Sequence, residues 1–109
     1  DGLIVSNHGG RQLDGVQSSV RALPGIVDAV GDQIPVLMDG GVRTGLDVLR
    51  ALALGAKACM IGRAWAFPLA AGGGAAVTRM LNLMRSELAV AMALTGCTDV
   101  RKAGRDLLA

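Results

Sequence analysis

Aromatic residues and cysteines are scarce in this chain of 109 residues. It has no tyrosine, one tryptophan and one phenylalanine, and its net charge of +2 comes from scattered basic residues. With so few rings to stack on bases, a nucleic-acid-binding protein is not expected. The two cysteines, Cys59 and Cys97, lack metal-ligand spacing, so we expect both to be buried thiols in a reduced cytosolic protein.

Long apolar runs and targeting signals are also missing. No stretch of about 18 apolar residues could span a membrane, and no signal peptide is visible. We therefore expect a cytoplasmic protein, attached at most peripherally to the inner face of the cell membrane. The chain starts at Asp1 rather than at methionine and enters a predicted strand almost at once, which suggests a piece of a longer protein.

What is present predicts a well-packed α/β unit, since 51% of the residues are hydrophobic and 18% are charged. Short apolar runs at 2–6, 34–39 and 58–62 alternate with helical patterns at 18–30 and 45–54. This order is typical of βαβ units, which build a parallel sheet. The apolar character of each run is continuous rather than alternating, so we expect strands that are covered on both faces.

The last third of the chain is predicted to be mainly helical. A short helix over 64–67 should end at Pro68, and a flexible turn at 72–74 should precede a long helix over 75–94. A last helix is expected to run through Leu107. The buried stripe of the long helix is predicted to consist of Leu81, Met84, Leu88 and Met92. Residues Arg79, Arg85 and Glu87 are expected to face water.

Each predicted strand is followed by a loop that holds residues capable of chemistry: 7–11, 39–43 and 62–63. In parallel α/β proteins the carboxyl ends of the strands form one edge, where ligands bind. We therefore expect the three loops to meet.

Two of these loops are predicted to bind one phosphate group. They supply Asp39, Gly40, Gly41, Val42, Arg43, Gly62 and Arg63. Glycines allow backbone N–H groups to face an anion, the start of the following helix adds partial positive charge, and the arginines add full charges. Many (β/α)₈ barrels bind phosphate after their last two strands. The alternative is a pair of ordinary glycine-rich turns with solvated arginines.

His8 and Arg11 indicate a different chemistry. A lone histidine is more often structural, but here two adjacent glycines clear space around it. Histidine exchanges a proton near neutral pH, and the planar fork of arginine matches a carboxylate. A base beside a carboxylate clamp suits proton removal from a small carboxylic acid.

Residues 6–14, SNHGGRQLD, resemble the signature of the FMN-dependent L-2-hydroxy-acid dehydrogenases and oxidases. The loops at 39–43 and 62–63 are similar to the FMN-phosphate positions of that family. The resemblance implies that residues 1–109 are a C-terminal fragment of one FMN-binding domain, namely strands six to eight, with their helices, of a (β/α)₈ TIM barrel. Three βα units cannot close a barrel of ~250 residues, so we expect this piece alone to be inactive.

The same resemblance implies roles for the candidate residues. His8 would be the catalytic base and Arg11 would hold the substrate carboxylate. FMN would be bound by Asp39, Gly40, Gly41, Val42, Arg43, Gly62 and Arg63. The substrate would be an L-2-hydroxy acid, with L-lactate oxidised to pyruvate as the first expectation, and glycolate or mandelate as alternatives. Electrons would pass on to a quinone, a cytochrome or oxygen, and the full-length protein is expected to be a homo-oligomer.

Two other kinds of protein also fit part of the pattern. Barrels similar to inosine-monophosphate dehydrogenase or isopentenyl-diphosphate isomerase carry an Asp-Gly-Gly-(Ile/Val)-Arg turn but lack the SNHGGR sequence. A non-catalytic phosphate-binding α/β module would explain the two glycine-arginine loops. It would leave His8 beside Arg11 without a role.

Overall fold

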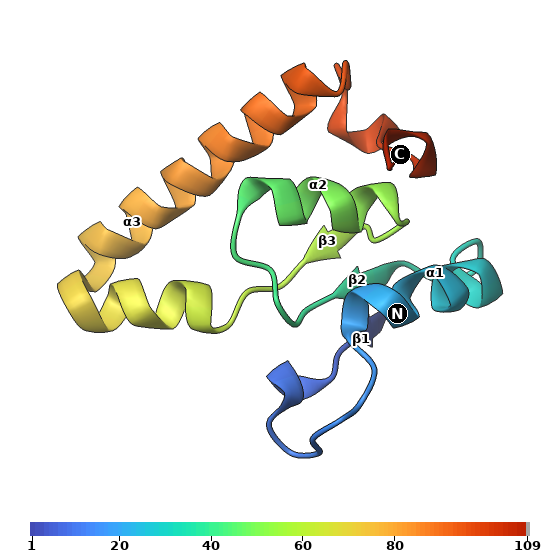
Figure 1. Cartoon of the computed structure of the whole chain (residues 1–109), viewed down its shortest axis with the longest axis horizontal. Coiled ribbons are helices and arrows are strands. Elements are labelled where there is room, and N and C mark those ends of the chain that lie inside the picture. The colour runs from blue at the N-terminus through green and yellow to red at the C-terminus, as the bar shows by residue number, and fades with distance from the viewer. Residues whose placement is uncertain (109) are drawn as a thin grey trace.

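The computed structural model describes residues 1–108, which form a parallel three-stranded sheet with helices (Figure 1). The strands and helices are β1 (Leu3–Val5), α1 (Ser19–Val30), β2 (Val36–Met38), α2 (Gly45–Ala53), β3 (Ala58–Cys59) and α3 (Arg63–Leu94). Three short 3₁₀ turns are η1 (His8–Gly10), η2 (Val100–Lys102) and η3 (Arg105–Leu107). The predicted βαβ order is confirmed, although each strand is shorter than its apolar run.

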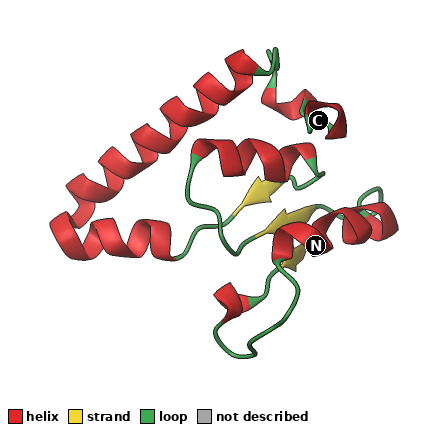
Figure 2. Ribbon diagram, viewed as in Figure 1, coloured by secondary structure: helices red, strands yellow, loops and turns green. Residues whose placement is uncertain are grey.

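The helices cover one face of the sheet in the described residues. The strands are parallel and lie in the order β1-β2-β3, which Figure 2 shows in yellow. Val5, Val36 and Met38 are buried in a core that also takes residues from α1, α2 and α3. Their neighbours along the strands point to the other face, where Ile4 is 49% exposed and Ala58 is exposed. The expectation that both faces are covered is therefore wrong for residues 1–108.

Helix α2 begins as its sequence predicts. Thr44 Oγ1 accepts a hydrogen bond from the Asp47 N–H (3.1 Å), and Asp47 Oδ2 accepts one from the Thr44 N–H (3.0 Å). This reciprocal capping box uses N–H groups that have no partner within the helix. The box places the end of the preceding loop, which carries Arg43, at a defined position.

Helix α3 differs from the prediction, because the first helical segment continues past Pro68. Proline removes one backbone hydrogen bond, but its fixed φ is compatible with a helix. The direction changes instead at Gly72 and Gly73, whose backbone angles are not helical (φ 62° at Gly73). Figure 1 shows the two straight segments on either side of this kink.

The predicted buried stripe of α3 is only partly correct. Met84 is buried, and Leu88 and Met92 are half-buried, but Leu81 is 50% exposed. The second segment of α3 buries a narrow strip, and Leu81 lies outside it. Glu87 was expected in water, yet it is half-buried and bonded to another helix, as described below.

The last helix predicted through Leu107 is replaced by η2 and η3, because Gly104 between them has an extended backbone (φ −133°, ψ 173°). Asp99 accepts hydrogen bonds from the backbone and the guanidinium of Arg101, which lower the pKa of its carboxyl group. Arg105 forms an ion pair with Asp28 of α1 (2.5 Å). This pair ties the end of the described chain to the first helix.

Both cysteines are free thiols, as expected, but they are only half-buried rather than buried. Cys59 lies on β3, and burial raises its pKa. None of the helices in residues 1–108 has an apolar stretch sufficient to cross a lipid bilayer.

Candidate functional site

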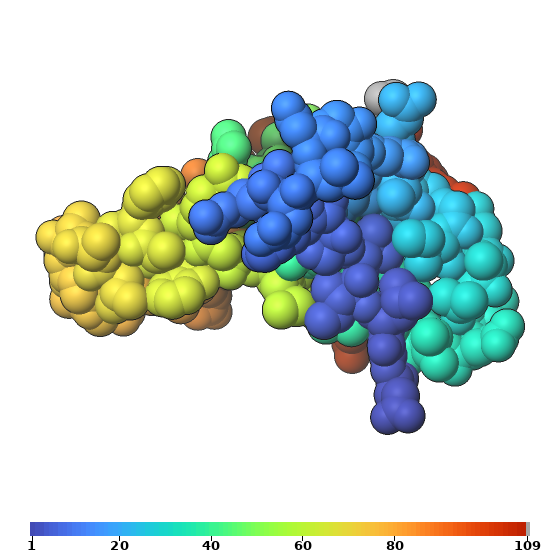
Figure 3. Space-filling view, turned by 90° about the horizontal axis from the view of Figure 1, so that it is seen from below, coloured from blue at the N-terminus to red at the C-terminus, as the bar shows by residue number. Residues whose placement is uncertain are grey.

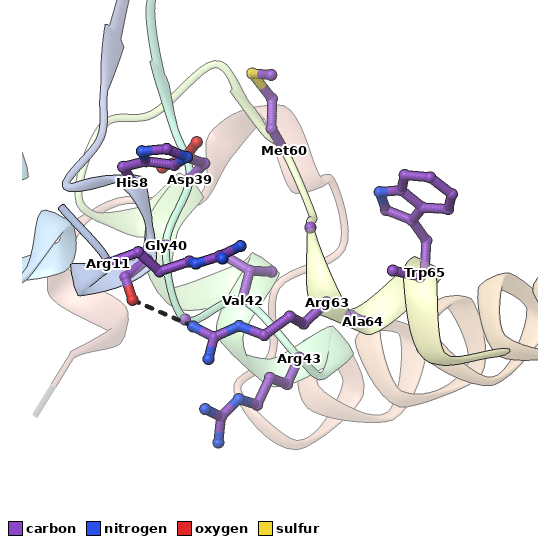
Figure 4. Close-up of a pocket in the computed structure, with 14 residues that line it drawn as sticks. His8, Arg11, Asp39, Gly40, Val42, Arg43, Met60, Arg63, Ala64 and Trp65 are labelled. Carbon is purple, nitrogen blue, oxygen red and sulfur yellow. Dashed lines mark hydrogen bonds between the residues drawn. The ribbon is translucent and has the colours of Figure 1, made fainter. Parts of the chain in front are cut away.

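A cavity of about 350 Å³ lies where the loops after all three strands come together (Figure 4). All nine candidate residues line it, as the parallel strand order predicts. They are His8, Arg11, Asp39, Gly40, Gly41, Val42, Arg43, Gly62 and Arg63. Met60 and Trp65 also line the cavity, and no sequence pattern pointed to them. The structure therefore brings together candidate residues that are up to 55 positions apart in the chain, from His8 to Arg63.

The loop that carries His8 has an unusual backbone. His8, Gly9 and Gly10 have φ values of 55°, 65° and 71°, and His8 is the one non-glycine residue with a positive φ within residues 1–108. Such a conformation costs free energy in residues that have a Cβ atom. It is held by hydrogen bonds from the His8 N–H to Ser6 Oγ (3.1 Å) and from the Gly10 N–H to the Asn7 carbonyl (3.0 Å). This turn leaves the imidazole exposed at the cavity.

Positive charge dominates the cavity. Arg11, Arg43 and Arg63 line it, whereas Asp39 supplies the only carboxylate among its lining residues. No ion pair within residues 1–108 occupies any of the three guanidinium groups. In Figure 4 the side chains of Arg11 and Arg63 extend into the same region. The cavity is thus suited to an anion, or to a ligand with more than one anionic group.

Arg63 also links two of the loops. Its Nη2 atom donates a hydrogen bond to the carbonyl oxygen of Gly9 (3.3 Å), drawn as the dashed line in Figure 4. Figure 3 shows the blue residues of this first loop against the yellow-green start of α3.

Carboxylates of the chain itself bind several N–H groups at the start of α2. Asp47 Oδ2 accepts hydrogen bonds from the N–H groups of Arg43 (3.1 Å) and Thr44 (3.0 Å). Glu87 Oε2 accepts one from the Gly45 N–H (2.8 Å). Two carboxylates therefore occupy the positive end of this helix. The N–H groups of Arg43, Thr44 and Gly45 are thus already bonded, whereas the side chain of Arg43 remains available, and a contribution of this helix start to phosphate binding stays a prediction.

The start of α3 is different. Its N-cap is Gly62, which has no side chain to accept a hydrogen bond from the first turn. Gly62, Arg63 and Ala64 all line the cavity. The uncapped positive end of this helix therefore faces the cavity, beside the guanidinium groups.

Several buried oxygen atoms near the cavity have no hydrogen-bond partner within the described residues. They are Asp39 Oδ1, Asn7 Oδ1 and Ser19 Oγ. The last two surround Gly40, since a Cβ atom there would lie 3.0 Å from Asn7 Oδ1 and 2.8 Å from Ser19 Oγ. Sequence reasoning missed Ser19, whose local pattern indicates only the start of a helix. Position 40 therefore accommodates glycine, because a side chain there would collide with the first loop and with α1.

These features define a parallel α/β protein with an arginine-lined cavity at the carboxyl edge of its sheet. The model of the FMN-dependent dehydrogenase family matches residues 1–109, and the chain belongs to this family. The match confirms the family to which the sequence was assigned.

Relatives of this chain are L-lactate dehydrogenases. It is 63% identical over 109 residues to an L-lactate dehydrogenase of Caulobacter vibrioides (strain NA1000 / CB15N). It is 60% identical over 108 residues to an L-lactate dehydrogenase of Azorhizobium caulinodans. All or 99% of the chain is covered in these comparisons, but the chain spans only 28% of each relative.

Solved structures have the same fold over this region. A monotopic membrane protein, (S)-mandelate dehydrogenase, superposes with a TM-score of 0.93 at 43% identity, covering 98% of this chain and 28% of that one. A mandelate oxidase superposes with a TM-score of 0.90 at 49% identity, covering 95% and 32%. The α/β architecture of the chain is thus that of part of an FMN-dependent enzyme.

Proposed function

We propose that residues 1–109 are the C-terminal part of one FMN-binding (β/α)₈ barrel and contribute its strands six to eight. The small share of each relative that the chain spans supports this proposal. The uncovered sheet face supports it as well, because Ile4 and Met60 are 49% and 43% exposed. In a closed barrel, apolar side chains on that face would pack in the interior.

We propose further that the full-length protein oxidises an L-2-hydroxy acid, with L-lactate converted to pyruvate. The observation that carries this proposal is the shared cavity of His8, Arg11 and the two glycine-arginine loops. The identity of 63% to an L-lactate dehydrogenase, against 43–49% to the mandelate enzymes, favours lactate over mandelate.

The cavity fits FMN by its chemistry. The phosphate would lie near Arg43, Arg63 and the uncapped start of α3, where positive charge and free donors meet. Asp39 Oδ1 is buried without a partner, and a buried carboxylate oxygen requires a donor. A hydroxyl of the ribityl chain would supply such a donor. FMN, when bound, would accept the two electrons that leave the substrate together with the second of its two protons.

The remaining residues act on the hydroxy acid. The fork of Arg11 pairs with the substrate carboxylate and orients the molecule. His8 takes a proton from the substrate as its carbinol carbon becomes a carbonyl carbon. The product is the corresponding 2-keto acid.

Anaerobic flavin reduction tests this function in the full-length protein. The purified protein should show the absorbance of bound yellow flavin, and L-lactate should bleach it. (S)-Mandelate and glycolate serve as comparison substrates. If the protein retains flavin but no 2-hydroxy acid reduces it, the proposed oxidation is refuted and a non-catalytic phosphate-binding module is favoured. The electron acceptor, a homo-oligomeric state and a place in the cytoplasm or at the inner membrane face stay predictions.

A further inference from the structure

Glu87 is the only glutamate in the chain, and its carboxylate lies at the start of α2. Its Oε2 atom accepts a hydrogen bond from the Gly45 N–H at 2.8 Å, between residues 42 positions apart. Glu87 is half-buried and belongs to the second segment of α3. The contact therefore joins two helices rather than neighbouring turns.

The two helix backbones touch at this point. A Cβ atom on Gly45 would overlap the backbone at Leu88 N and Met84 O, and would lie 2.7 Å from the carbonyl carbon of Glu87. Only glycine permits this approach. The approach buries the Gly45 N–H, which has its partner in Glu87.

Both halves of the anion site are consequently attached to α3. Arg63 is the first residue of this helix and lines the cavity. Arg43, the other phosphate candidate, precedes Gly45 by two residues. Figure 1 shows α3 turning at its kink, so that its second segment runs beside α2. The separation of the two arginines thus depends on how α2 is held against α3.

We propose that Glu87 is a positioning residue for the phosphate of FMN, acting by holding the loop that carries Arg43 in register with Arg63. The inference rests on the proposed function, in which this cavity binds FMN. Loss of the Glu87 carboxylate leaves the Gly45 N–H buried without a partner, which favours movement of the start of α2. The movement is transmitted to Arg43 through the capping box of Thr44 and Asp47.

Titration of the full-length apoprotein with FMN and with riboflavin, which lacks the phosphate, tests the proposal. Glu87→Ala should weaken FMN binding about tenfold and leave riboflavin binding within about twofold of wild type. Glu87→Gln should bind FMN within about threefold of wild type, because its amide oxygen accepts the same hydrogen bond. Asp32→Ala, which removes an exposed carboxylate, is the charge-matched control and should change neither affinity.

Three results would overturn the proposal: unchanged FMN affinity in Glu87→Ala, equal losses for FMN and riboflavin, or a Glu87→Gln variant as weak as Glu87→Ala. If Glu87→Ala does not fold, Glu87→Asp carries the same test, because its shorter side chain withdraws the carboxylate from Gly45. A wild-type protein that binds riboflavin as tightly as FMN would refute the phosphate site itself. That outcome removes the proposed function together with this inference, and Arg43→Met would then also leave FMN affinity unchanged.

Discussion

The side chain of Arg63 donates a hydrogen bond to the backbone of Gly9, with 3.3 Å between Nη2 and the carbonyl oxygen. Arg63 is the first residue of α3, which follows β3, and Gly9 lies in the turn that follows β1; these two strands are at opposite ends of the sheet order. Gly9 has a φ of 65°, and a Cβ atom there would lie 3.1 Å from Nη2 of Arg63. One guanidinium group therefore supports the turn that presents His8 while it lines the proposed phosphate site.

Replacing Arg63 should affect both parts of the site. In Arg63→Leu we expect weaker FMN binding and, at saturating FMN, a kcat/KM for L-lactate reduced roughly 10- to 150-fold, as for loss of a charged hydrogen bond. Arg43→Leu is the matched control, since no hydrogen bond joins its side chain to the His8 loop in the described residues. This variant should weaken FMN binding and leave kcat/KM at saturating FMN unchanged. Steady-state kinetics at several FMN concentrations distinguish the two. A wild-type value of kcat/KM in Arg63→Leu at saturating FMN would show that the hydrogen bond from Arg63 to Gly9 does not support the His8 turn.

Replacing His8 should separate cofactor binding from chemistry. His8→Gln is expected to retain bound flavin while the rate of its reduction by L-lactate falls by about 10²–10⁴-fold, because the proton acceptor is lost. His8→Asn is a useful companion, since asparagine tolerates a positive φ such as the 55° found here. Stopped-flow absorbance measures both variants. A reduction rate within tenfold of wild type in either one would exclude His8 as the base.

Arg11 should act mainly on substrate binding. Arg11→Met is expected to weaken the interaction with the acid by ~2–5 kcal/mol, as for loss of one partner of a desolvated charge pair. Arg11→Lys keeps the charge but loses the planar fork, so its affinity for the acid should lie between those of Arg11→Met and wild type. The measurement is the dependence of flavin reduction on L-lactate concentration. An unchanged half-saturating concentration in Arg11→Met would refute the clamp.

Gly40 and Gly41 allow backbone strain to be distinguished from crowding. Both have a φ of 87°, but only at Gly40 would a Cβ atom meet neighbours, namely Ser19 Oγ and Asn7 Oδ1. Gly41→Ala should cost ~1–2 kcal/mol of unfolding free energy from strain alone. Gly40→Ala should cost roughly 1–3 kcal/mol more from overpacking. Urea unfolding of the full-length protein provides the comparison. Equal losses would show that the space around Gly40 does not constrain the loop.

The thiol of Cys59 should react slowly in the native protein. Burial disfavours the thiolate and so raises the pKa of this group, which leaves less of the reactive form at any given pH. We expect iodoacetamide to modify native Cys59 more slowly than the same residue in urea at pH 8, and the native rate to keep rising above that pH. Mass spectrometry of timed samples measures this. Equal native and unfolded rates would contradict the shift.

The sequence predicts which residues meet at the cavity because its signals are local. Each apolar run leads directly into its functional loop, and parallel strands bring such loops to one edge, as found for His8, Asp39 and Arg63. The cap at Thr44 is likewise set by residues three apart. These features require no knowledge of distant contacts, and they carried the family resemblance as well.

Long-range contacts account for what the sequence could not predict. Glu87 lies beside exposed residues on a helix, and only its packing against Gly45 makes it a partner of α2. The continuous apolar runs predicted that both faces of the sheet are covered. Residues 1–108 cover only one of these faces. At α3, proline and glycine compete as helix breakers, and the glycine pair bends the chain because its backbone adopts angles that other residues avoid.

The candidate site lies at the carboxyl ends of the parallel strands, whereas the loops at their amino ends contain no candidate residue. The connections at 31–35 and 55–57 enter β2 and β3 at the amino ends of those strands, and none of their residues lines the cavity. Strand β2 has three residues and extends about 10 Å, so the connection at 31–35 lies roughly that far from the site loop at 39–43. Asp32 and Gln33 are exposed there. A fluorescent label or an affinity tag attached at these two positions would therefore lie away from the cavity.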